Sequence, residues 1–289
     1  MQATYVYPNT CEIPQRGGLL SRWKLLANSE FSVIEVPADF IKNNSEEVKT
    51  GLSVTDFLSE KAIETLYNKG DNIPSELQYI LHTEPSLPRT DHYQIVTQPL
   101  LKWYDKQWVE KLCEMTLNIS KFLSKPPFAI EIHPGDNRNK YSDICEAANF
   151  LIERYFAELK VRPLILLENR TGQFISKGSD ISCFWKLLKQ NYTFLEDKVG
   201  IVLDIQQLFT VTRKQFEEQF EKIPFDAIKG VHIHSKHKAP KSSDEIPWVA
   251  VFEKLSKIAK NLIVNPEVSH RSDIQRTLDF WKNGIEGSH

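Results

Sequence analysis

The sequence predicts an α/β fold, specifically a single (β/α)8 TIM barrel. Short apolar runs alternate with longer amphipathic segments through the chain, an order that implies a parallel sheet with right-handed helical crossovers. Several of the apolar runs end in a histidine or a carboxylate. A closed barrel brings all strand ends to one mouth, whereas the alternative, a doubly wound open sheet, does not explain so many strands that end in ligand-type residues.

The predicted strands are the short aliphatic and aromatic runs Thr4–Tyr7, Phe31–Val36, Gln78–His82, Phe128–His133, Leu164–Glu168, Gly200–Asp204, Gly230–His234 and Leu262–Glu267. The predicted helices are the amphipathic segments Trp108–Leu123, Ser142–Leu159, Ile181–Asn191, Arg213–Lys222, Trp248–Lys260 and Asp273–Lys282. In Trp248–Lys260, Val249, Phe252 and Leu255 recur at helical spacing and predict a face that packs against the core.

Residues 1–286 are predicted to form one domain, because the composition does not change along the chain. Polar and proline-rich stretches at 37–77 and 83–107 predict long loops or short helices inserted after the second and third strands. Loops in this position lie at the C-terminal mouth of a barrel, where they shape specificity. Residues 287–289 are interpreted as the remnant of a tag.

Composition narrows the classes of function. The 289 residues carry a formal net charge of −2, which argues against a broad electrostatic grip on nucleic acid. The four cysteines are far apart and contain no C-x-x-C pair, a distribution typical of reduced thiols in a cytoplasmic protein. Neither a signal peptide nor an apolar run long enough to span a membrane is visible.

Glu168 is the most informative residue, because it ends the aliphatic run Leu164–Leu167. A carboxylate inside a barrel needs a counter-charge, which a divalent cation supplies. The ligand-type residues at predicted strand ends are His82, His133, Glu168, Asp204, His232 and Glu267. Six ligands exceed one tetrahedral site, so we expect two ions with Glu168 as the bridge. This mixed imidazole and carboxylate set suits Zn²⁺ best, with Mn²⁺, Fe²⁺ or Mg²⁺ as alternatives.

Four short motifs resemble those of endonuclease IV-type enzymes. His133-Pro134-Gly135 resembles an H-P-G element, and the segment that begins at Glu168, E-N-R-T-G-Q, is similar to E-N-T-A-G-Q. V-G-I-V-L-D, which ends at Asp204, resembles V-G-x-x-L-D, and G-V-H, which ends at His232, resembles G-x-H. Order and spacing match over roughly residues 78–267, which places the chain with the xylose isomerase-like, endonuclease IV-like barrels.

The resemblance implies a (β/α)8 fold with divalent metals at its C-terminal mouth. Carried over by position, His82, His133 and Glu168 hold one ion, and Glu168, Asp204, His232 and Glu267 hold a second. Asn265 is the alternative to Glu267 as the last ligand. The family's third metal site is expected to be missing, because Gln207 replaces a histidine and no D-x-H element follows His232. The segments at 37–44 and 83–88 also show no clear equivalent of the family's DNA-reading side chains.

Residues near the ligand set have several interpretations. Glu35 and Glu131 face the interior of the predicted barrel, as a general base, an extra ligand or the partner of an arginine or lysine. Arg170 is a candidate for binding a substrate phosphate or for neutralising the carboxylates. His234 is a second substrate-binding candidate and an alternative to His232. His237 lies in a small basic patch with Lys236 and Lys238.

Three functions are compatible with this sequence. The first is metal-dependent hydrolysis of a phosphoester, in the manner of endonuclease IV and including nucleic acid as a substrate, in which two ions activate a water and stabilise the departing oxygen. The second is isomerisation or epimerisation of a sugar or hydroxy-ketone, in which Glu168 and Glu267 are the catalytic proton carriers. The third is a non-catalytic barrel with a degenerate metal site. The expected partner is therefore a phosphorylated or sugar-containing substrate.

Overall fold

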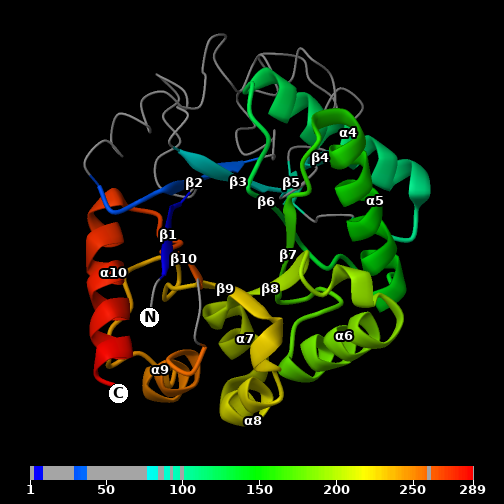
Figure 1. Cartoon of the computed structure of the whole chain (residues 1–289). Coiled ribbons are helices and arrows are strands. Elements are labelled where there is room, and N and C mark those ends of the chain that lie inside the picture. Colours follow the sequence, from blue (N-terminus) through cyan, green and yellow to red (C-terminus); the bar gives the residue numbers. More distant parts are fainter. Residues whose placement is uncertain are drawn as a thin grey trace.

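Eight parallel strands close into a barrel in the order β1-β10-β9-β8-β7-β6-β3-β2 (Figure 1). The structure is a computed structural model that describes residues 3–8, 29–37, 77–83, 88–91, 94–97, 101–258 and 262–288. The barrel strands are β1 (Thr4–Tyr7), β2 (Val33–Pro37), β3 (Gln78–His82), β6 (Ala129–Ile132), β7 (Leu164–Glu168), β8 (Val199–Asp204), β9 (Ile228–His232) and β10 (Ile263–Asn265). Each overlaps a predicted strand, and the predicted TIM barrel is confirmed.

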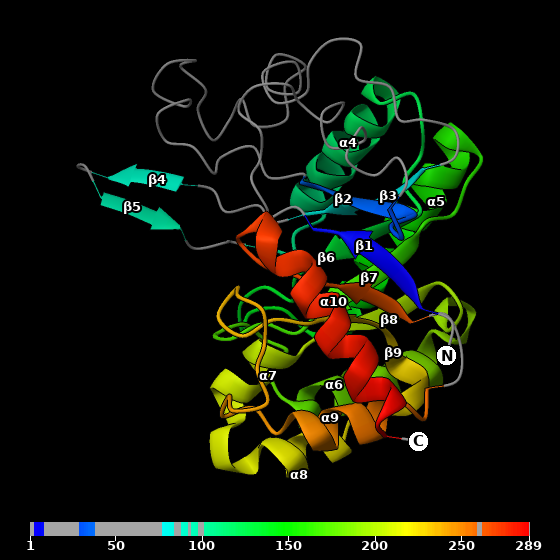
Figure 2. The same ribbon diagram turned by 90° about the vertical axis from the view of Figure 1, so that its left-hand side faces the viewer.

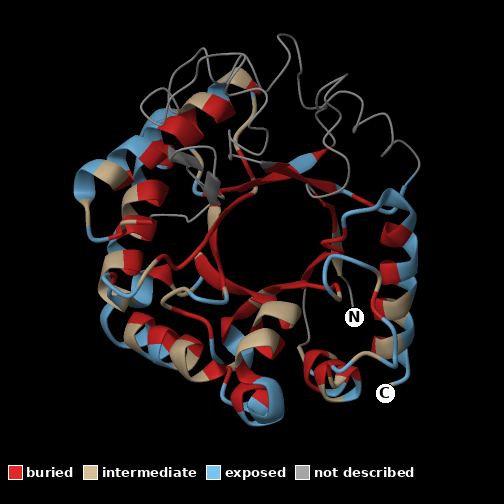
Figure 3. Ribbon diagram, turned by 180° about the vertical axis from the view of Figure 1, so that it is seen from behind, coloured by how far each residue is buried: buried red, intermediate tan, exposed pale blue. Residues whose placement is uncertain are grey.

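Helices surround the barrel and cover the outer face of its strands (Figure 1). They are α4 (Lys106–Phe122), α5 (Tyr141–Leu159), α6 (Gly178–Asn191), α7 (Ile205–Thr212), α8 (Phe216–Glu221), α9 (Trp248–Leu255) and α10 (Arg271–Glu286), with short 3₁₀ turns η1 (Thr193–Leu195), η2 (Arg213–Gln215) and η3 (Phe225–Ala227). Strands and inward helix faces are buried, whereas the outward helix faces are exposed (Figure 3). None of the described helices combines the length and apolar character that crossing a membrane requires.

The structure differs from the prediction at three places. The structure has a helix at Ile205–Thr212 that was not predicted, because it starts directly after β8 without a loop to separate strand from helix. The predicted helix Arg213–Lys222 begins as the 3₁₀ turn η2 and continues as α8, and the φ of 48° at Arg213 separates it from α7. Val249 is 72% exposed, and α9 turns Val251, Phe252 and Leu255 inward instead.

The predicted insertions are only partly described. Residues 38–76 of the first lie outside the described residues. Within the second, β4 (Pro88–Asp91) and β5 (Gln94–Thr97) pair as an antiparallel hairpin, where loops or short helices were expected. The hairpin stands beside the barrel rather than in it (Figure 2). It shows that part of this insertion has its own local structure.

The inside of the barrel is apolar at one level and polar at the next. The apolar layer consists of Val6, Val33, Ile80, Ala129, Leu166, Val202 and Ile263, which pack into one cluster. Side chains two positions apart on a strand face the same side. Two positions after Val33, Ile80, Ala129 and Leu166 come Glu35, His82, Glu131 and Glu168. The strand period therefore places a polar layer directly above the apolar one, towards the carboxyl ends of the strands.

Candidate metal centre

Two polar layers occupy the C-terminal end of the barrel. The first holds Glu35, His82, Glu131, Glu168, Asp204, His232 and Asn265, and the second, two positions further along, holds His133, Arg170, His234 and Glu267. Apart from Arg170, none of these residues exposes more than 8% of its surface. The carboxylates and imidazoles of seven strands, β2, β3 and β6 to β10, are therefore crowded together in a site that water barely reaches.

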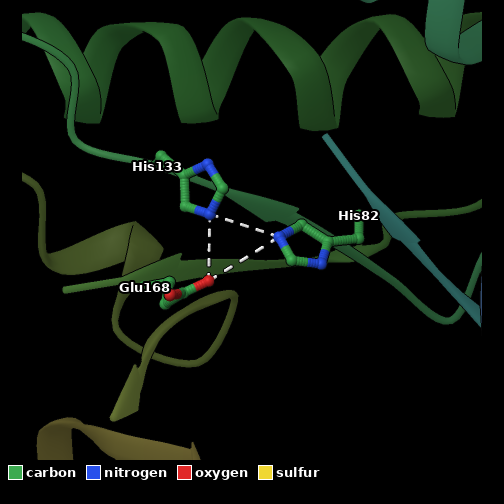
Figure 4. A group of neighbouring side chains, drawn as sticks. All are labelled: His82, His133 and Glu168. Atoms are coloured by element: carbon green, nitrogen blue, oxygen red, sulfur yellow. Dashed lines mark hydrogen bonds and ion pairs between the residues drawn. The ribbon is translucent and has the colours of Figure 1, made fainter. Parts of the chain in front are cut away.

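His82, His133 and Glu168 form the first ligand group (Figure 4). His133 Nε2 lies 3.2 Å from His82 Nε2 and 2.9 Å from Glu168 Oε2, and His82 Nε2 lies 3.6 Å from the same oxygen. Ligands about 2.1 Å from a tetrahedral zinc ion stand roughly 3.4 Å apart. The three atoms therefore already have the spacing that a single ion requires.

Asp204, His232 and Glu267 form a second ligand group. His232 Nδ1 lies 3.3 Å from Glu267 Oε2 and 3.9 Å from Glu168 Oε2. Glu168 also belongs to a group with Glu131 and His232. Its carboxylate consequently lies between the two ligand groups, in the position that a bridging ligand would take.

The histidines of the site differ in their affinity for protons. Burial alone lowers the pKa of a histidine, but the carboxylates of Glu131 and Glu35 raise the pKa of His82 to about 10. Against the same burial, Glu131 and Glu267 raise the pKa of His232 well above its ordinary value. His133 differs, because burial and the nearby Arg170 guanidinium hold its pKa well below that value. The low pKa of His133 favours a neutral imidazole, the form that a metal ligand requires.

The carboxylates divide in the same way. Burial, with Glu267 and Asp204 close by, raises the pKa of Glu168 well above its ordinary value. Burial also raises the pKa of Glu267, but the imidazoles of His232 and His234 beside its carboxylate outweigh burial and hold this pKa well below the usual range. Without an ion, protons on histidines and on Glu168 offset the crowded negative charge. A divalent cation can replace these protons.

Three buried polar atoms of the site make no hydrogen bond: Glu131 Oε1, His232 Nδ1 and Asn265 Oδ1. Buried polar atoms without hydrogen bonds are rare, and one explanation is a missing ion. His232 Nδ1 is the atom that faces Glu168 and Glu267. The donor set and this nitrogen fit a divalent cation bound by imidazole and carboxylate.

The structure gives the contacts of the predicted ligands on the last barrel strands. Asp204 has two roles, since Oδ1 caps α7 by accepting from Gln207 N at 2.8 Å, while Oδ2 lies 3.3 Å from His234 Nε2. Of the two candidates on the last strand, Glu267 approaches His232 Nδ1. The Asn265 amide instead donates to Glu35 Oε2 at 3.3 Å. The geometry therefore favours Glu267 as the ligand.

The candidate substrate-binding residues lie in different surroundings. The Arg170 guanidinium is 2.9 Å from His133 Nε2, at the edge of the first ligand group. His234 is buried, and its Nε2 lies 3.3 Å from Glu267 Oε2 as well as close to Asp204. The His237 ring stacks on that of His234 with 4.6 Å between centroids. Glu35 pairs with His82 and Glu131 with His232, so both glutamates pair with histidines, where an arginine or lysine was considered.

Polar residues of the motifs act as clamps between neighbouring loops. The Asn169 side chain accepts from Asp204 N at 2.9 Å and donates to Asp204 O at 3.1 Å, which fixes the end of β8 to the end of β7. Gln173 Oε1 accepts from Gly135 N at 2.7 Å. Gln207 Oε1 accepts from Thr171 N at 3.1 Å. These hydrogen bonds join loops that are far apart in the sequence, so the partners could not be predicted from the motifs.

Replacing Gly135 by alanine is expected to destabilise the protein by at least about 2 kcal/mol. Gly135 has a φ of 77°, and an added Cβ would lie 2.5 Å from the Leu101 carbonyl oxygen and 2.4 Å from Asn139 Nδ2. Urea unfolding measures the effect. Gly172, whose φ is 76° and around which nothing lies within 4 Å of an added Cβ, is the control, because its alanine variant retains only the backbone strain. Equal losses at the two positions would contradict the clash.

Comparison with known proteins supports the fold and leaves the activity open. No family model and no curated protein matches the chain. A D-tagatose 3-epimerase-like protein superposes with a TM-score of 0.59 at 18% identity, over 99% of this chain and 98% of that one. An AP endonuclease of family 2 from Brucella melitensis superposes with a TM-score of 0.57 at 12% sequence identity, over 97% of this chain and 98% of that one. An IolI protein with a bound zinc atom superposes with a TM-score of 0.57 at 11% sequence identity, over 99% of each chain. The chain therefore shares the TIM-barrel fold of these proteins.

Proposed function

We propose that the protein is a divalent-metal-dependent phosphoester hydrolase with a two-ion centre. The observation that supports this best is the position of Glu168 between the group of His82 and His133 and the group of Asp204, His232 and Glu267. Two ions that share a carboxylate suit the displacement at phosphorus, in which an attacking and a departing oxygen both need stabilisation. A proton shuttle on a sugar requires only one ion.

The chain's own residues divide the remaining work. His82, His133 and Glu168 would hold one ion, and Asp204, His232 and Glu267, together with Glu168, the other. When bound, the ions act as Lewis acids and lower the pKa of an attacking water. Arg170 lies within hydrogen-bond distance of His133 and is placed to orient an anionic substrate, because its planar guanidinium binds two phosphate oxygens at once.

The substrate that fits best is a small phosphorylated molecule, such as a sugar phosphate. The net charge of −2 offers no broad attraction for a nucleic acid backbone. An AP endonuclease of family 2 is among the structures of similar fold, so damaged DNA is the second substrate to test. Zn²⁺ is the proposed ion, and a zinc atom in the IolI structure of similar fold agrees with this choice.

A hydrolysis assay tests the proposal. We expect the zinc-loaded or manganese-loaded protein to release phosphate from phosphomonoesters or to cleave a phosphodiester, and to lose this activity when a chelator is added. An Arg170→Met variant should raise KM at least about tenfold, because it loses a charge-assisted contact with the phosphate. The effect on kcat should be smaller. Duplex DNA with an abasic site belongs in the substrate panel. The proposal is ruled out if no substrate of the panel is hydrolysed with Zn²⁺, Mn²⁺, Fe²⁺ or Mg²⁺.

Isomerisation or epimerisation of a sugar or hydroxy-ketone is the second candidate. Two carboxylates, Glu168 and Glu267, approach the same nitrogen of His232, at 3.9 and 3.3 Å, and such a pair could remove and return a proton. An L-ribulose 3-epimerase and a 3-keto-D-glucoside 4-epimerase are among the structures of similar fold. Exchange of solvent deuterium into a ketose without phosphate release would favour this function. Fewer than about one tightly bound ion per chain would favour a non-catalytic barrel.

A further inference from the structure

Two buried carboxylates stand behind the ligand groups. Glu35 Oε1 is hydrogen-bonded to His82 Nδ1, while the other ring nitrogen, Nε2, points to His133 and Glu168. Figure 4 shows this direction, with one His82 nitrogen turned to the group and the other turned away. Glu35 exposes 1% of its surface. A fully buried carboxylate therefore contacts the nitrogen of His82 that is not available to the first ion.

Glu131 stands beside His232 as an ion-pair partner and not through a hydrogen bond, and the two ring nitrogens are exchanged relative to His82. Glu131 Oε1 lies 3.1 Å from His232 Nε2, and His232 Nδ1 faces the second ligand group. Glu131 Oε1 is also 3.9 Å from His82 Nε2, which is beyond hydrogen-bond distance. One carboxylate thus stands behind a histidine of each ligand group.

We infer that Glu35 and Glu131 are positioning residues for the metal centre, each of which fixes the ring of one ligand histidine so that its other nitrogen faces an ion. The inference rests on the proposed two-ion centre. A neutral imidazole has one N–H and one lone pair, and a carboxylate that accepts the N–H leaves the lone pair on the opposite nitrogen. It also makes the imidazole a stronger donor to the ion. Glu35 acts on His82 through this hydrogen bond. Glu131 acts on His232 through its charge, which lies 3.1 Å from Nε2.

Asn265 connects Glu35 with His232, the partner of Glu131. Its Nδ2 donates to Glu35 Oε2 at 3.3 Å and lies 3.4 Å from His232 Nε2. In register, Asn265 is opposite His232, as His82 is opposite Glu131. The two carboxylates and the amide therefore form one connected layer beneath the ligand atoms. This layer, rather than solvent or loops, determines the orientation of both rings.

Metal affinity measured one group at a time tests the inference. His133→Ala leaves the second group intact, and Asp204→Ala leaves the first. In the Asp204→Ala background, Glu35→Gln should weaken zinc binding at the remaining site by roughly 10- to 100-fold. This is the usual effect of removing a carboxylate that is hydrogen-bonded to a ligand histidine. In the His133→Ala background the same change should alter affinity by less than about twofold. Glu131→Gln should give the reverse pattern. Calorimetric titration with Zn²⁺ against a competing chelator provides the affinities.

Controls separate positioning from loss of charge or of fold. Glu158→Gln removes one carboxylate from an exposed ion pair with Lys121 and should leave both affinities unchanged. Glu35→Asp keeps a carboxylate and should recover part of the affinity that Glu35→Gln loses. The absorption spectrum of Co²⁺-loaded variants should keep its tetrahedral form while binding weakens. Complete loss of the ion in Glu131→Gln would make Glu131 a ligand and overturn its positioning role.

Failure of this inference differs from failure of the proposed function. If the wild-type protein binds two ions and hydrolyses a phosphoester, but the glutamine variants bind zinc as tightly as it does, the inference is overturned alone. If the affinities change as expected and no phosphoester is hydrolysed, the inference stands and the proposed function does not. A wild-type protein that binds fewer than two ions overturns both.

Discussion

Replacing Glu168 by alanine is expected to lower the metal content from about two ions per chain to fewer than about one. Among the described residues, Glu168 alone is shared between the group of His82 and His133 and a group that contains His232. Its loss would leave both proposed ions short of a ligand and without a bridge. Structural ions stabilise a folded chain by mass action, with about 2.7 kcal/mol for an ion present at 100 times its Kd. The variant should therefore also unfold at a lower temperature when zinc is present.

Metal analysis after gel filtration, combined with thermal unfolding in the presence and absence of Zn²⁺, measures both effects. Glu168→Gln is the matched variant of similar volume, and it should lose metal in the same way while it leaves no cavity. Glu158→Ala, at an exposed ion pair with Lys121, should keep the wild-type metal content. An alanine variant that still binds two ions would contradict the bridging role of Glu168.

Removing the ions with a chelator should lower the free energy of unfolding by roughly 5 kcal/mol, the sum for two ions that are each present at 100 times their Kd. The physical reason is the crowding of buried carboxylates at the mouth of the barrel, whose charges the ions neutralise. Urea unfolding with and without chelator gives the difference, and added Zn²⁺ should restore the original midpoint.

The Glu168→Ala variant provides a cross-check on that measurement. A protein that no longer holds the ions has little to lose, so the chelator should shift its unfolding midpoint much less than it shifts the wild-type midpoint. Identical wild-type midpoints with and without chelator would show that no ion contributes to the folded state. That result would remove the support for a two-ion centre.

Much of the site could be predicted because it follows from strand period. Glu168, Asp204 and His232 each end an aliphatic run, and a run that ends in a ligand-type residue is visible without a structure. The same period placed Glu35 and Glu131 inside the barrel. Their partners could not be predicted, because Glu35 meets His82 from the neighbouring strand, whereas Glu131 meets His232 across the barrel.

The missed elements have local causes. The helix Ile205–Thr212 follows β8 directly, and its N-cap is Asp204, a residue that the pattern already assigned to metal binding. The β4–β5 hairpin lies in a stretch that contains prolines and shows no clear apolar alternation. Asp204 thus has two uses, and single-sequence pattern reasoning assigned only one of them.

The sequence by itself determined the barrel and the strand ends that provide histidines and carboxylates, because alternation along a strand is a local property that any single strand displays. Only the tertiary structure decided which of these groups meet. Barrel closure and strand register bring Glu168 between His133 and His232, and they place Glu35 and Glu131 behind the ligand histidines. Distances across a closed barrel depend on all of its strands together, so no segment of the sequence contains them.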